Sequence, residues 1–454
     1  MTIDIVILAA GQGTRMKSAL PKVLHHLAGK PLIQHVVNTA TTVPDSDITI
    51  VTGYASEQIK TSVAGGNLRY VYQKEQLGTA HAVQVAVSNL TSTGTTLIIY
   101  GDVPLISSET LMATLDLVNN NTMGLLTAQH TNPEGYGRIL RDKQGQIYGI
   151  VEQKDATSEE QEIQEVNTGV MAIRTDHLQE WLPQIENDNA QNEYYLTDLI
   201  AIANREGVVI QSIQPARFQE VEGVNTRTQL SELERFYQYE QAKNLMVNGA
   251  TLADPRRVDI RGQLNCGIDT FIDINVIFEG QVRLGKNVTI GPNCIIIDSS
   301  IGDNVEIKAN TIIEKSTVCN SVSVGPFARV RPGTHLSDNS KIGNFVEVKN
   351  TQVGKGSKIN HLSYIGDSEL GKDVNVGAGT ITCNYDGAYK HKTIMGDDSF
   401  IGSNSSLVAP LNIGKNATIG AGSTITKDVP DKNLSIARSL QKNIFNWVRP
   451  KNKK

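Results

Sequence analysis

A glycine-rich loop near the N-terminus combines an open backbone with fixed positive charge. The segment reads Gly11-Gln-Gly-Thr-Arg15, and a lysine follows at position 22. Glycines let backbone N–H groups approach a phosphate, and Arg15 and Lys22 can neutralise several phosphate oxygens. For Gly-x-Gly alone an ordinary strand-to-helix turn is the favoured interpretation. The dinucleotide fingerprint needs Gly or Ala where Met16 stands, and the P-loop pattern is absent.

A carboxylate follows a later apolar run. Asp102 comes directly after residues 95–101, which read as a buried strand. A carboxylate in that place can hold Mg²⁺ between phosphates. Nucleotidyl transfer needs mainly positioning and charge neutralisation. A helix N-cap or turn aspartate is the alternative for this residue.

The C-terminal half carries a second group of reactive side chains. Arg331 and Lys349 each follow a valine, and the two residues are 18 positions apart. Such a basic pair can bind a phosphate. His361 lies two residues after Ile359, and a lone surface histidine is more often structural than functional.

Two kinds of element must position these residues, and the first is a layered α/β domain. Apolar runs alternate with helical patterns in the N-terminal half, which indicates a doubly wound fold. The expected strands are 3–10, 47–53, 68–73, 95–101, 124–128 and 208–213, and two of the expected helices are 32–41 and 79–89. Ligands bind outside the carboxyl ends of such strands, which is where the 11–22 loop follows the first strand.

The second kind of element is a repeat with a six-residue step. Aliphatic residues recur every six, or sometimes five, positions between Leu284 and Ile425, and a glycine often follows them. Taking every third one gives Leu284, Ile301, Val318, Leu336, Val353 and Leu370, which are 17 or 18 residues apart. A triangular parallel β-solenoid with three short strands per coil explains this spacing. An ordinary β-sandwich would not hold a fixed period for so long.

The prism assigns side chains to faces. Arg331 and Lys349 should stack one coil apart as a basic pair, and Glu347 and Tyr364 should stack in the same way. The repeat is interrupted at 383–393, which contains Cys-Asn-Tyr-Asp-Gly. An insertion that interrupts a solenoid is where a binding loop is expected.

The N-terminal motifs resemble those of the sugar-1-phosphate nucleotidylyltransferases. The string Leu8-Ala-Ala-Gly-x-Gly-Thr-Arg-Met with Leu20-Pro-Lys22 matches their signature loop, and segments 73–80, 100–104 and 167–169 look like further motifs. The resemblance implies that Asp102 and Asn225 bind Mg²⁺ and that Arg15 and Lys22 serve catalysis. The nucleotide and sugar site that it implies consists of Leu8, Ala9, Ala10, Gly11, Lys22, Gln73, Gly78, Thr79, Tyr100, Gly101, Asp102, Gly137, Glu152, Asn167 and Asn225.

Within that set, the uridylyltransferase branch of the family implies finer roles. Gln73, Gly78 and Thr79 match the positions that read the uracil. Gly137, Glu152 and Asn167 match the positions that hold the sugar.

With the C-terminal motifs the resemblance covers essentially the whole chain. The whole chain is similar to the bacterial bifunctional UDP-N-acetylglucosamine pyrophosphorylases and glucosamine-1-phosphate N-acetyltransferases. The matching motifs are Arg331-Pro-Gly, Glu347-Val-Lys-Asn, His361-Leu-Ser-Tyr-Ile-Gly-Asp, Asn375-Val-Gly-Ala-Gly and Cys383-Asn-Tyr-Asp-Gly. The resemblance implies a left-handed parallel β-helix that forms a homotrimer, with sites between neighbouring coils. Only the resemblance gives the handedness, because the usual chirality rule favours the opposite hand.

The same resemblance implies roles in acetyl transfer. His361 matches a general base for the sugar amine, Glu347 a residue that orients it, and Asn384 a partner of the acetyl carbonyl. The implied amino-sugar phosphate site is Arg331, Lys349, Tyr364 and Asn375, and the implied acetyl-CoA site is Ala378, Asn384, Tyr385, Ser403, Ala421 and Arg438.

Composition sets broad limits on the class of protein. The chain has 454 residues, too many for one core, and its net charge of −5 gives no general reason to expect nucleic acid. Its four cysteines show no CxxC spacing and read as reduced thiols. No apolar run reaches the roughly 18 residues of a membrane span. We therefore expect a cytoplasmic protein without membrane insertion; its basic tail, 449–454, reads as a solvated end.

We expect three segments. Residues 1–227 should form the uridylyltransferase (pyrophosphorylase) domain, 228–248 a helical linker and 249–454 the hexapeptide-repeat N-acetyltransferase domain. The apolar spacing in 228–248 suits an amphipathic helix, and an extra helix of the first domain is equally compatible with it.

The expected enzyme acetylates glucosamine 1-phosphate from acetyl-CoA and then joins N-acetylglucosamine 1-phosphate to UMP from UTP. The product, UDP-N-acetylglucosamine, is a precursor of peptidoglycan and lipopolysaccharide. Two alternatives stay open: a nucleotidylyltransferase whose solenoid only oligomerises it, and a non-enzymatic sugar-nucleotide sensor.

Overall fold

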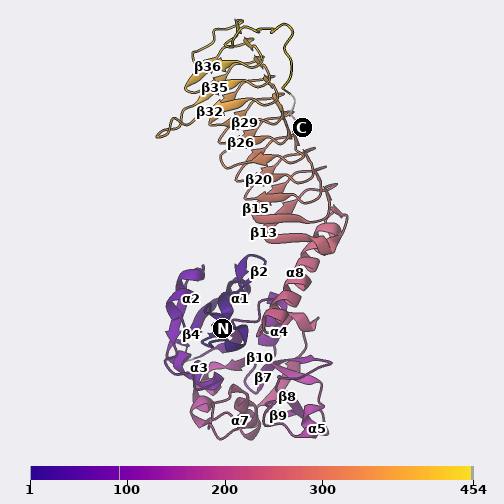
Figure 1. The fold of residues 1–454 in the computed structure, drawn as a ribbon. Helices are drawn as coiled ribbons and strands as arrows, with labels where there is room; N and C mark the ends of the chain where they lie inside the picture. The colour runs from indigo at the N-terminus through magenta and orange to yellow at the C-terminus, as the bar shows by residue number, and fades with distance from the viewer. Residues whose placement is uncertain (1, 92, 451–454) are drawn as a thin grey trace. The chain divides into compact units, whose positions relative to one another are not determined.

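The computed structural model describes residues 2–91 and 93–450 (Figure 1). Two compact units share the chain, residues 1–237 and residues 238–454. Within the described ranges no helix is both long and apolar enough to cross a membrane. The last four residues of the basic tail, 451–454, lie outside the described residues.

The first unit is built on a nine-stranded sheet whose main path is β11-β7-β10-β6-β1-β4-β5. Its strands are β1 (Ile3–Ala9), β4 (Ser46–Thr52), β5 (Leu68–Tyr72), β6 (Thr95–Tyr100), β7 (Thr122–Gln129), β8 (Arg138–Arg141), β9 (Ile147–Val151), β10 (Glu165–Arg174) and β11 (Val209–Ile213). All six predicted strands are present, with ends within two residues of the prediction. The sequence did not indicate β8, β9 or β10, of which β10 runs antiparallel to both β6 and β7.

Helices cover both faces of this sheet. They are α1 (Leu32–Ala40), α2 (Ser56–Ser62), α3 (Thr79–Ala86), α4 (Ser108–Leu115), α5 (Ser158–Gln161), α6 (Thr175–Trp181) and α7 (Leu199–Arg205), with a small β2 (His26–Leu27) and β3 (Lys30–Pro31) hairpin. Alternate residues of a strand point to opposite faces. Accordingly, Ile5 and Ile7 of β1 pack in one buried cluster and Val6 in the other. The doubly wound prediction is confirmed.

Helix α8 (Arg227–Val247) contributes side chains to the cores of both units. In the first unit Leu233 is buried with Met16 and Leu32. In the second unit the buried Gln238 amide pairs with the Ile260 backbone, donating to its carbonyl at 3.0 Å and accepting from its N–H at 2.7 Å. Both ends of α8 lie within one residue of the helix that the sequence predicts, 228–248.

The second unit is a parallel β-helix in which short strands stack from coil to coil (Figure 1). One sheet has eleven strands from β12 (Thr251–Leu252) to β39 (Leu434–Ser435), and the other has seventeen from β13 (Val258–Cys266) to β38 (Thr424–Ile425). Between these ends, the two sheets include β23 (Arg329–Val330), β25 (Lys341–Asn344), β26 (Glu347–Lys349), β28 (Lys358–His361), β29 (Tyr364–Gly366), β31 (Asn375–Val376), β32 (Ile381–Cys383) and β33 (Thr393–Met395).

The register of this β-helix follows the aliphatic repeat. Leu284 pairs with Ile301, Ile301 with Val318, and so on through Leu336 and Val353 to Leu370, always in parallel. These side chains are between fully buried and 6 % exposed. Inward aliphatic residues therefore form one continuous core along the stack, as the spacing predicts.

The corners of the prism need left-handed backbone. One corner column consists of Gly280, Asp298, Lys315, Gly333, Asn350 and Asp367, all with φ between +42° and +80°. Glycine adopts this conformation freely, and asparagine and aspartate tolerate it better than other residues. In a second column the side chains of Asn275, Asn293 and Asn310 donate to one another in series at 2.9 and 3.2 Å.

The insertion loop, residues 384–392, leaves the stack between β32 and β33. Tyr385 and Lys390 form an isolated antiparallel bridge within it. The Asp386 carboxylate accepts from the backbone N–H groups of Ala388 and Tyr389 at 2.8 and 2.7 Å and contacts His391 Nε2 at 2.6 Å. The loop is therefore folded by its own hydrogen bonds.

Candidate active sites

The loop after β1 is shaped by one glycine. Gly13 has φ +67°, and a Cβ placed there would lie 2.4 Å from Lys22 Cβ. Any larger residue would push Lys22 away, so the glycine allows this close approach. The loop places Arg15 and Lys22 at the carboxyl end of the parallel strands.

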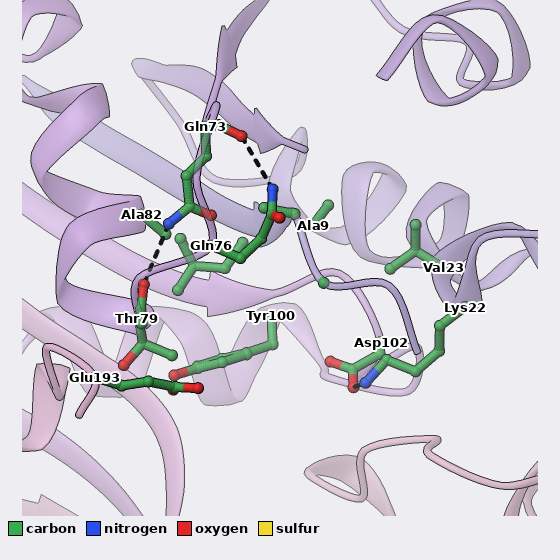
Figure 2. A pocket seen from close by; sticks show the side chains of 14 residues that line it. Ala9, Lys22, Val23, Gln73, Gln76, Thr79, Ala82, Tyr100, Asp102 and Glu193 are labelled. Carbon is green, nitrogen blue, oxygen red and sulfur yellow. Dashed lines mark hydrogen bonds and ion pairs between the residues drawn. The ribbon is translucent and has the colours of Figure 1, made fainter. Parts of the chain in front are cut away.

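Four charged or polar side chains converge beside this loop. Lys22 Nζ donates to Asp102 Oδ2 at 2.5 Å and to Asn225 Oδ1 at 2.9 Å. Arg15 Nη2 donates to the same Asn225 oxygen at 2.9 Å. Figure 2 shows the Lys22 and Asp102 side chains together at one side of the cavity. The structure thus brings together all four residues that the sequence singled out for phosphate and metal chemistry.

The donor set of this cluster fits Mg²⁺. A carboxylate oxygen of Asp102 and an amide oxygen of Asn225 already face one cationic nitrogen. Both are hard oxygen donors, and Mg²⁺ is commonly held by one or two protein oxygens with substrate phosphates and water. Within the described ranges no group of three or more His, Cys, Asp or Glu side chains could hold a metal. The protein's share of a magnesium site would therefore be these two oxygens.

A cavity of about 300 Å³ opens next to the cluster (Figure 2). It is lined by Leu8, Ala9, Ala10, Gly11, Lys22, Val23, Gln73, Gln76, Gly78, Thr79, Ala82, Tyr100, Asp102 and Glu193. The Gln73 side chain is buried and held by the Gly78 carbonyl at 3.3 Å and by His81 Nδ1 at 3.0 Å. Gln76 Nε2 donates to the Gln73 carbonyl at 3.1 Å. This end of the cavity presents fixed amide groups suited to a flat polar ring.

A second cavity, of about 330 Å³, continues from the first. It shares Lys22, Thr79, Tyr100, Asp102 and Glu193 with the first cavity, and it is also lined by Val103, Gly135, Tyr136, Gly137, Glu152, Asn167, Thr168, Gly169, Gln191, Tyr195, Thr197, Val221, Gly223 and Asn225. Burial raises the pKa of Glu152, although the hydrogen bond from Thr197 opposes this. Burial also raises the pKa of Tyr136 to about 12. The Tyr136 hydroxyl is therefore neutral near pH 7, and hydroxyl and carboxyl groups of this kind can form hydrogen bonds with a sugar.

The expected nucleotide and sugar residues therefore meet in two joined cavities. Arg15 reaches them through Asn225, and Gly101 follows Tyr100 at the strand end. Sequence reasoning missed Gln76, Glu193 and Thr197. Gln76 lies inside the 73–80 motif and could have been noticed. Glu193 lies in a loop and Thr197 in the short 3-10 helix Leu196–Asp198, and no spacing in the sequence links either to the site.

The second candidate site lies on the solenoid, and its register agrees with the predicted faces. Glu347 pairs with Tyr364, and Val348 pairs with Val330 on one side and Ile365 on the other. Arg331 and Lys349, which follow these valines, therefore occupy matching places in successive coils. Arg331 Nη1 also donates to Glu347 Oε1 at 2.6 Å.

A third cation joins this basic pair. The Lys390 side chain of the insertion loop lies within hydrogen-bonding reach of Lys349, whose charge lowers the pKa of Lys390. Arg331 lowers the same pKa further, while Asp367 opposes the shift. Three cations gathered in this way suit a doubly charged phosphate. Lys390 was missed because the insertion breaks the repeat that assigns faces.

His361 is the last residue of β28, three residues before Tyr364, and one of its ring nitrogens has a partner. Its Nδ1 lies 2.6 Å from the Asn344 side-chain oxygen, one coil earlier. Because that oxygen is an acceptor, Nδ1 carries the hydrogen and Nε2 is the basic nitrogen. Glu347 has Arg331 as its partner, so orientation of His361 by Glu347 stays a prediction.

The remaining expected residues lie on the following coils. Asn375 begins β31 and is half-buried, and Tyr385 is 60 % exposed at the start of the insertion loop. Ala378, Ser403 and Ala421 each lie two residues after Val376, Ile401 and Ile419, which pair in register. Arg438 Nη1 donates to the Ala421 carbonyl at 2.5 Å. Ala378, Ser403 and Ala421, three of the expected acetyl-CoA residues, thus follow one line along the stack.

The side chain of Asn384 is held by the carboxylate of Asp367. The Asn384 side chain is buried, and its Nδ2 donates to Asp367 Oδ2 at 2.5 Å. Asp367 is the last residue of the His361 motif, but sequence reasoning gave it no role of its own.

Comparison with known proteins agrees with both units. Residues 5–162 match the family model for a MobA-like NTP transferase domain. Residues 281–315 match the hexapeptide repeat of succinyl-transferase, and residues 392–427 match the bacterial transferase hexapeptide with six repeats. These repeats agree with a left-handed parallel β-helix.

Curated relatives match over the full length. A protein of Marinobacter nauticus described as "Bifunctional protein GlmU" is 55 % identical over 449 residues, which cover 99 % of each chain. Proteins of the same description from Cellvibrio japonicus and Idiomarina loihiensis are 54 % and 53 % identical, covering 99 % and 100 % of this chain and all of theirs.

Proposed function

The chain belongs to the family of bifunctional GlmU proteins, which are both uridylyltransferases and acetyltransferases, and from this premise we propose which of its residues carry each reaction. One reaction transfers an acetyl group from acetyl-CoA to glucosamine 1-phosphate. The other transfers a uridylyl group from UTP to N-acetylglucosamine 1-phosphate and releases pyrophosphate. We assign the first reaction to the β-helix and the second to the α/β unit.

In uridylyl transfer a phosphate oxygen of the sugar attacks the α-phosphorus of UTP, and pyrophosphate leaves. Arg15 and Lys22 neutralise the phosphates on the cavity side. Mg²⁺ bound to Asp102 and Asn225 would supply further positive charge to the phosphates. Convergence of these four side chains at one point is the observation that carries the assignment.

Each of the two joined cavities binds a different part of the product, UDP-N-acetylglucosamine. We place the uracil at the amide-lined end, against Gln73 and Gln76, and the sugar in the second cavity beside Glu152 and Asn167. The shared residues Lys22 and Asp102 then lie between base and sugar, where the phosphates must be.

In acetyl transfer the sugar nitrogen attacks the thioester carbonyl, and the CoA thiolate leaves. His361 Nε2 takes a proton from the amine as the C–N bond forms. Arg331, Lys349 and Lys390 hold the sugar phosphate, and Asn384 stabilises negative charge on the carbonyl oxygen. The basic Nε2 that the Asn344 contact leaves on His361, and the gathering of Arg331, Lys349 and Lys390, support this assignment.

We also propose that the protein is a homotrimer assembled on its β-helix. An exposed apolar corner supports this: the Phe327 and Phe345 rings stack with centroids 5.1 Å apart while 49 % and 55 % exposed. Leu362, directly after His361, is 64 % exposed. Exposed apolar groups of this kind mark interaction surfaces. The four free cysteines fit the reducing cytoplasm, where we place the reaction and its supply of cell-wall precursor.

One coupled assay tests the proposal. The purified chain is given glucosamine 1-phosphate, acetyl-CoA, UTP and Mg²⁺, and the release of CoA and of pyrophosphate is followed. We expect both, with pyrophosphate released only after acetylation. CoA release without Mg²⁺, and no pyrophosphate release without it, would support the magnesium assignment. Pyrophosphate release from N-acetylglucosamine 1-phosphate with no CoA release would show that the solenoid only oligomerises the chain.

A further inference from the structure

Asp367 is a nearly buried carboxylate in the middle of the candidate acetyl-transfer site. Its side chain is 10 % exposed. Oδ1 accepts from Asn350 Nδ2 at 2.7 Å, while Oδ2 accepts from Lys349 Nζ at 3.3 Å and from Asn384 Nδ2 at 2.5 Å. One oxygen therefore contacts both a cation of the phosphate cluster and the amide that begins the insertion loop.

The corner position explains the first of these contacts but not the other two. Asp367 has φ +49° and follows Asn350, with φ +47°, in the corner column defined above. Asparagine alone suffices for such stacking, because Asn275 and Asn293 are joined through amide groups in the other column. An asparagine at 367 could serve Asn350 equally well. The carboxylate's second oxygen and its negative charge are needed only by Lys349 and Asn384.

The ionisation of Asp367 agrees with this use. Burial alone would raise the pKa of the carboxyl group. Hydrogen bonds from Asn350, Asn384 and Lys349 outweigh burial and hold the pKa below its ordinary value. The group is therefore an acceptor at both oxygens near neutral pH.

We propose that Asp367 is a positioning residue for acetyl transfer, which fixes Lys349 against the sugar phosphate and Asn384 against the acetyl carbonyl through one carboxylate oxygen. The inference rests on the proposed assignment of acetyl transfer to the β-helix. Asp367 would act through Lys349 and Asn384. Its carboxylate would thereby connect binding of the sugar phosphate to stabilisation of the acetyl carbonyl.

The test is Asp367→Asn in the full chain. The variant keeps the size of the side chain, the left-handed corner and one bond to Asn350. It replaces an acceptor with an NH₂ group, which leaves Lys349 and Asn384 facing a donor. Since a hydrogen bond to a charged group is worth roughly a tenfold effect or more, we expect kcat for acetyl transfer to fall about tenfold or more. KM for glucosamine 1-phosphate should rise by a similar factor. Uridylyl transfer from N-acetylglucosamine 1-phosphate should stay at the wild-type rate.

Asp298→Asn is the matched control. Asp298 lies in the same corner column at φ +44°, and among the described residues its carboxylate accepts a hydrogen bond only from the Gln281 backbone N–H, at 2.9 Å. Its replacement should change neither reaction. Asp367→Gly is a second variant, because Gly333 shows that glycine suits this column. It removes the carboxylate without backbone strain and carries the test if Asp367→Asn folds poorly, which the thermal midpoint and uridylyl transfer report.

A double-mutant cycle separates positioning from general support of the fold. If Asp367 acts through Asn384, then Asp367→Asn should lower kcat less than about twofold in an Asn384→Ala background, because coupled residues are non-additive. Acetyl-transfer kcat and KM within twofold of wild type in Asp367→Asn would overturn the inference, as would full additivity or an equal loss of uridylyl transfer. Absence of acetyl transfer in the wild-type chain would instead overturn the proposed function on which the inference rests.

Discussion

At the scale of single residues, Asp102 allows the two reactions to be separated. Asp102→Asn should reduce uridylyl transfer strongly, because an amide oxygen binds Mg²⁺ less well than a carboxylate and no longer neutralises Lys22. Acetyl transfer should persist, since the β-helix is unchanged. Pyrophosphate and CoA release by the purified variant measure the two effects. Equal loss of both in a folded chain would contradict a two-site enzyme.

His361 gives the complementary separation. His361→Ala should lower acetyl transfer about 10²–10⁴-fold, the usual contribution of a general base. Supplying N-acetylglucosamine 1-phosphate should bypass the defect and restore UDP-N-acetylglucosamine formation. Asn344→Ala is a useful companion, because it leaves the imidazole but removes its 2.6 Å partner. A fall in acetylation of less than about tenfold in His361→Ala would lie below the general-base range and remove this role.

Sequence alone identified residues whose place follows from spacing. Arg331 and Lys349 could be placed one coil apart because each follows an inward valine, and the register agrees. The roles of two other residues, Asp367 and Lys390, could not be predicted from spacing. Asp367 gains its role from partners 17 and 18 residues earlier and 17 later, which needs the register of three coils at once. Lys390 lies in an insertion where the repeat assigns no face.

At the scale of elements, the packing of α1 against the first half of α8 should depend on pH. Burial lowers the pKa of His35 on α1, whose Nε2 contacts the Leu27 carbonyl and whose ring meets Tyr237 edge-on at 5.7 Å. Lys30 lowers this pKa further, whereas the Leu27 contact and Glu234 oppose the shift. A lowered folded pKa means that the neutral ring stabilises the fold fully above its ordinary value of 6.5, and this stability is lost as pH falls through the folded pKa.

The comparison variant is His35→Gln, which keeps an N–H for the Leu27 carbonyl but does not titrate. We expect the thermal midpoint of the wild type, relative to the variant, to fall between about pH 8 and about pH 5. Other titrating groups act equally on both proteins and cancel in the difference. A difference that is constant with pH, or that grows as pH falls, would contradict the sign argued above.

Most of the predicted elements are present, and β10, one of the three strands that the sequence did not indicate, was missed for a physical reason. Strands such as β1 and β6 are buried on both faces, so their sequences are continuous apolar runs that predict strands. β10 mixes polar residues of the sugar cavity, including Asn167, with a buried second half. A strand that serves the site for half its length lacks the continuous apolar pattern by which the others were found.

At the scale of the whole molecule, the place where the first unit ends can be tested by truncation. A fragment ending at Tyr237 should be more stable than one ending at Arg227. The longer fragment retains Leu233, which is 1 % exposed, and the Glu234 carboxylate that accepts from Ala28 N–H at 2.7 Å. Burying one leucine contributes about 1.5–3 kcal/mol, so the thermal midpoints should differ by at least about 3 °C. Equal midpoints would show that this half of α8 adds nothing to the first unit.

The same fragments test where the trimer forms. Both should keep uridylyl transfer and behave as monomers in light scattering, because we place the assembly contacts on the β-helix. The full chain measured beside them should scatter as a trimer. A trimeric fragment that lacks all the repeats would move the interface to the α/β unit.

The stacking of coils also sets the unit in which this half of the chain can gain or lose length during evolution. Removing six residues, one step of the repeat, would keep every aliphatic side chain inside, yet it would move all later residues to the next face. A deletion of this kind between Arg331 and Lys349 would take the two cations to different sides of the prism. Removing a whole coil before Arg331 would return each later residue to its own column and leave the site intact. Inserts of any other length belong outside the stack, where residues 384–392 already lie.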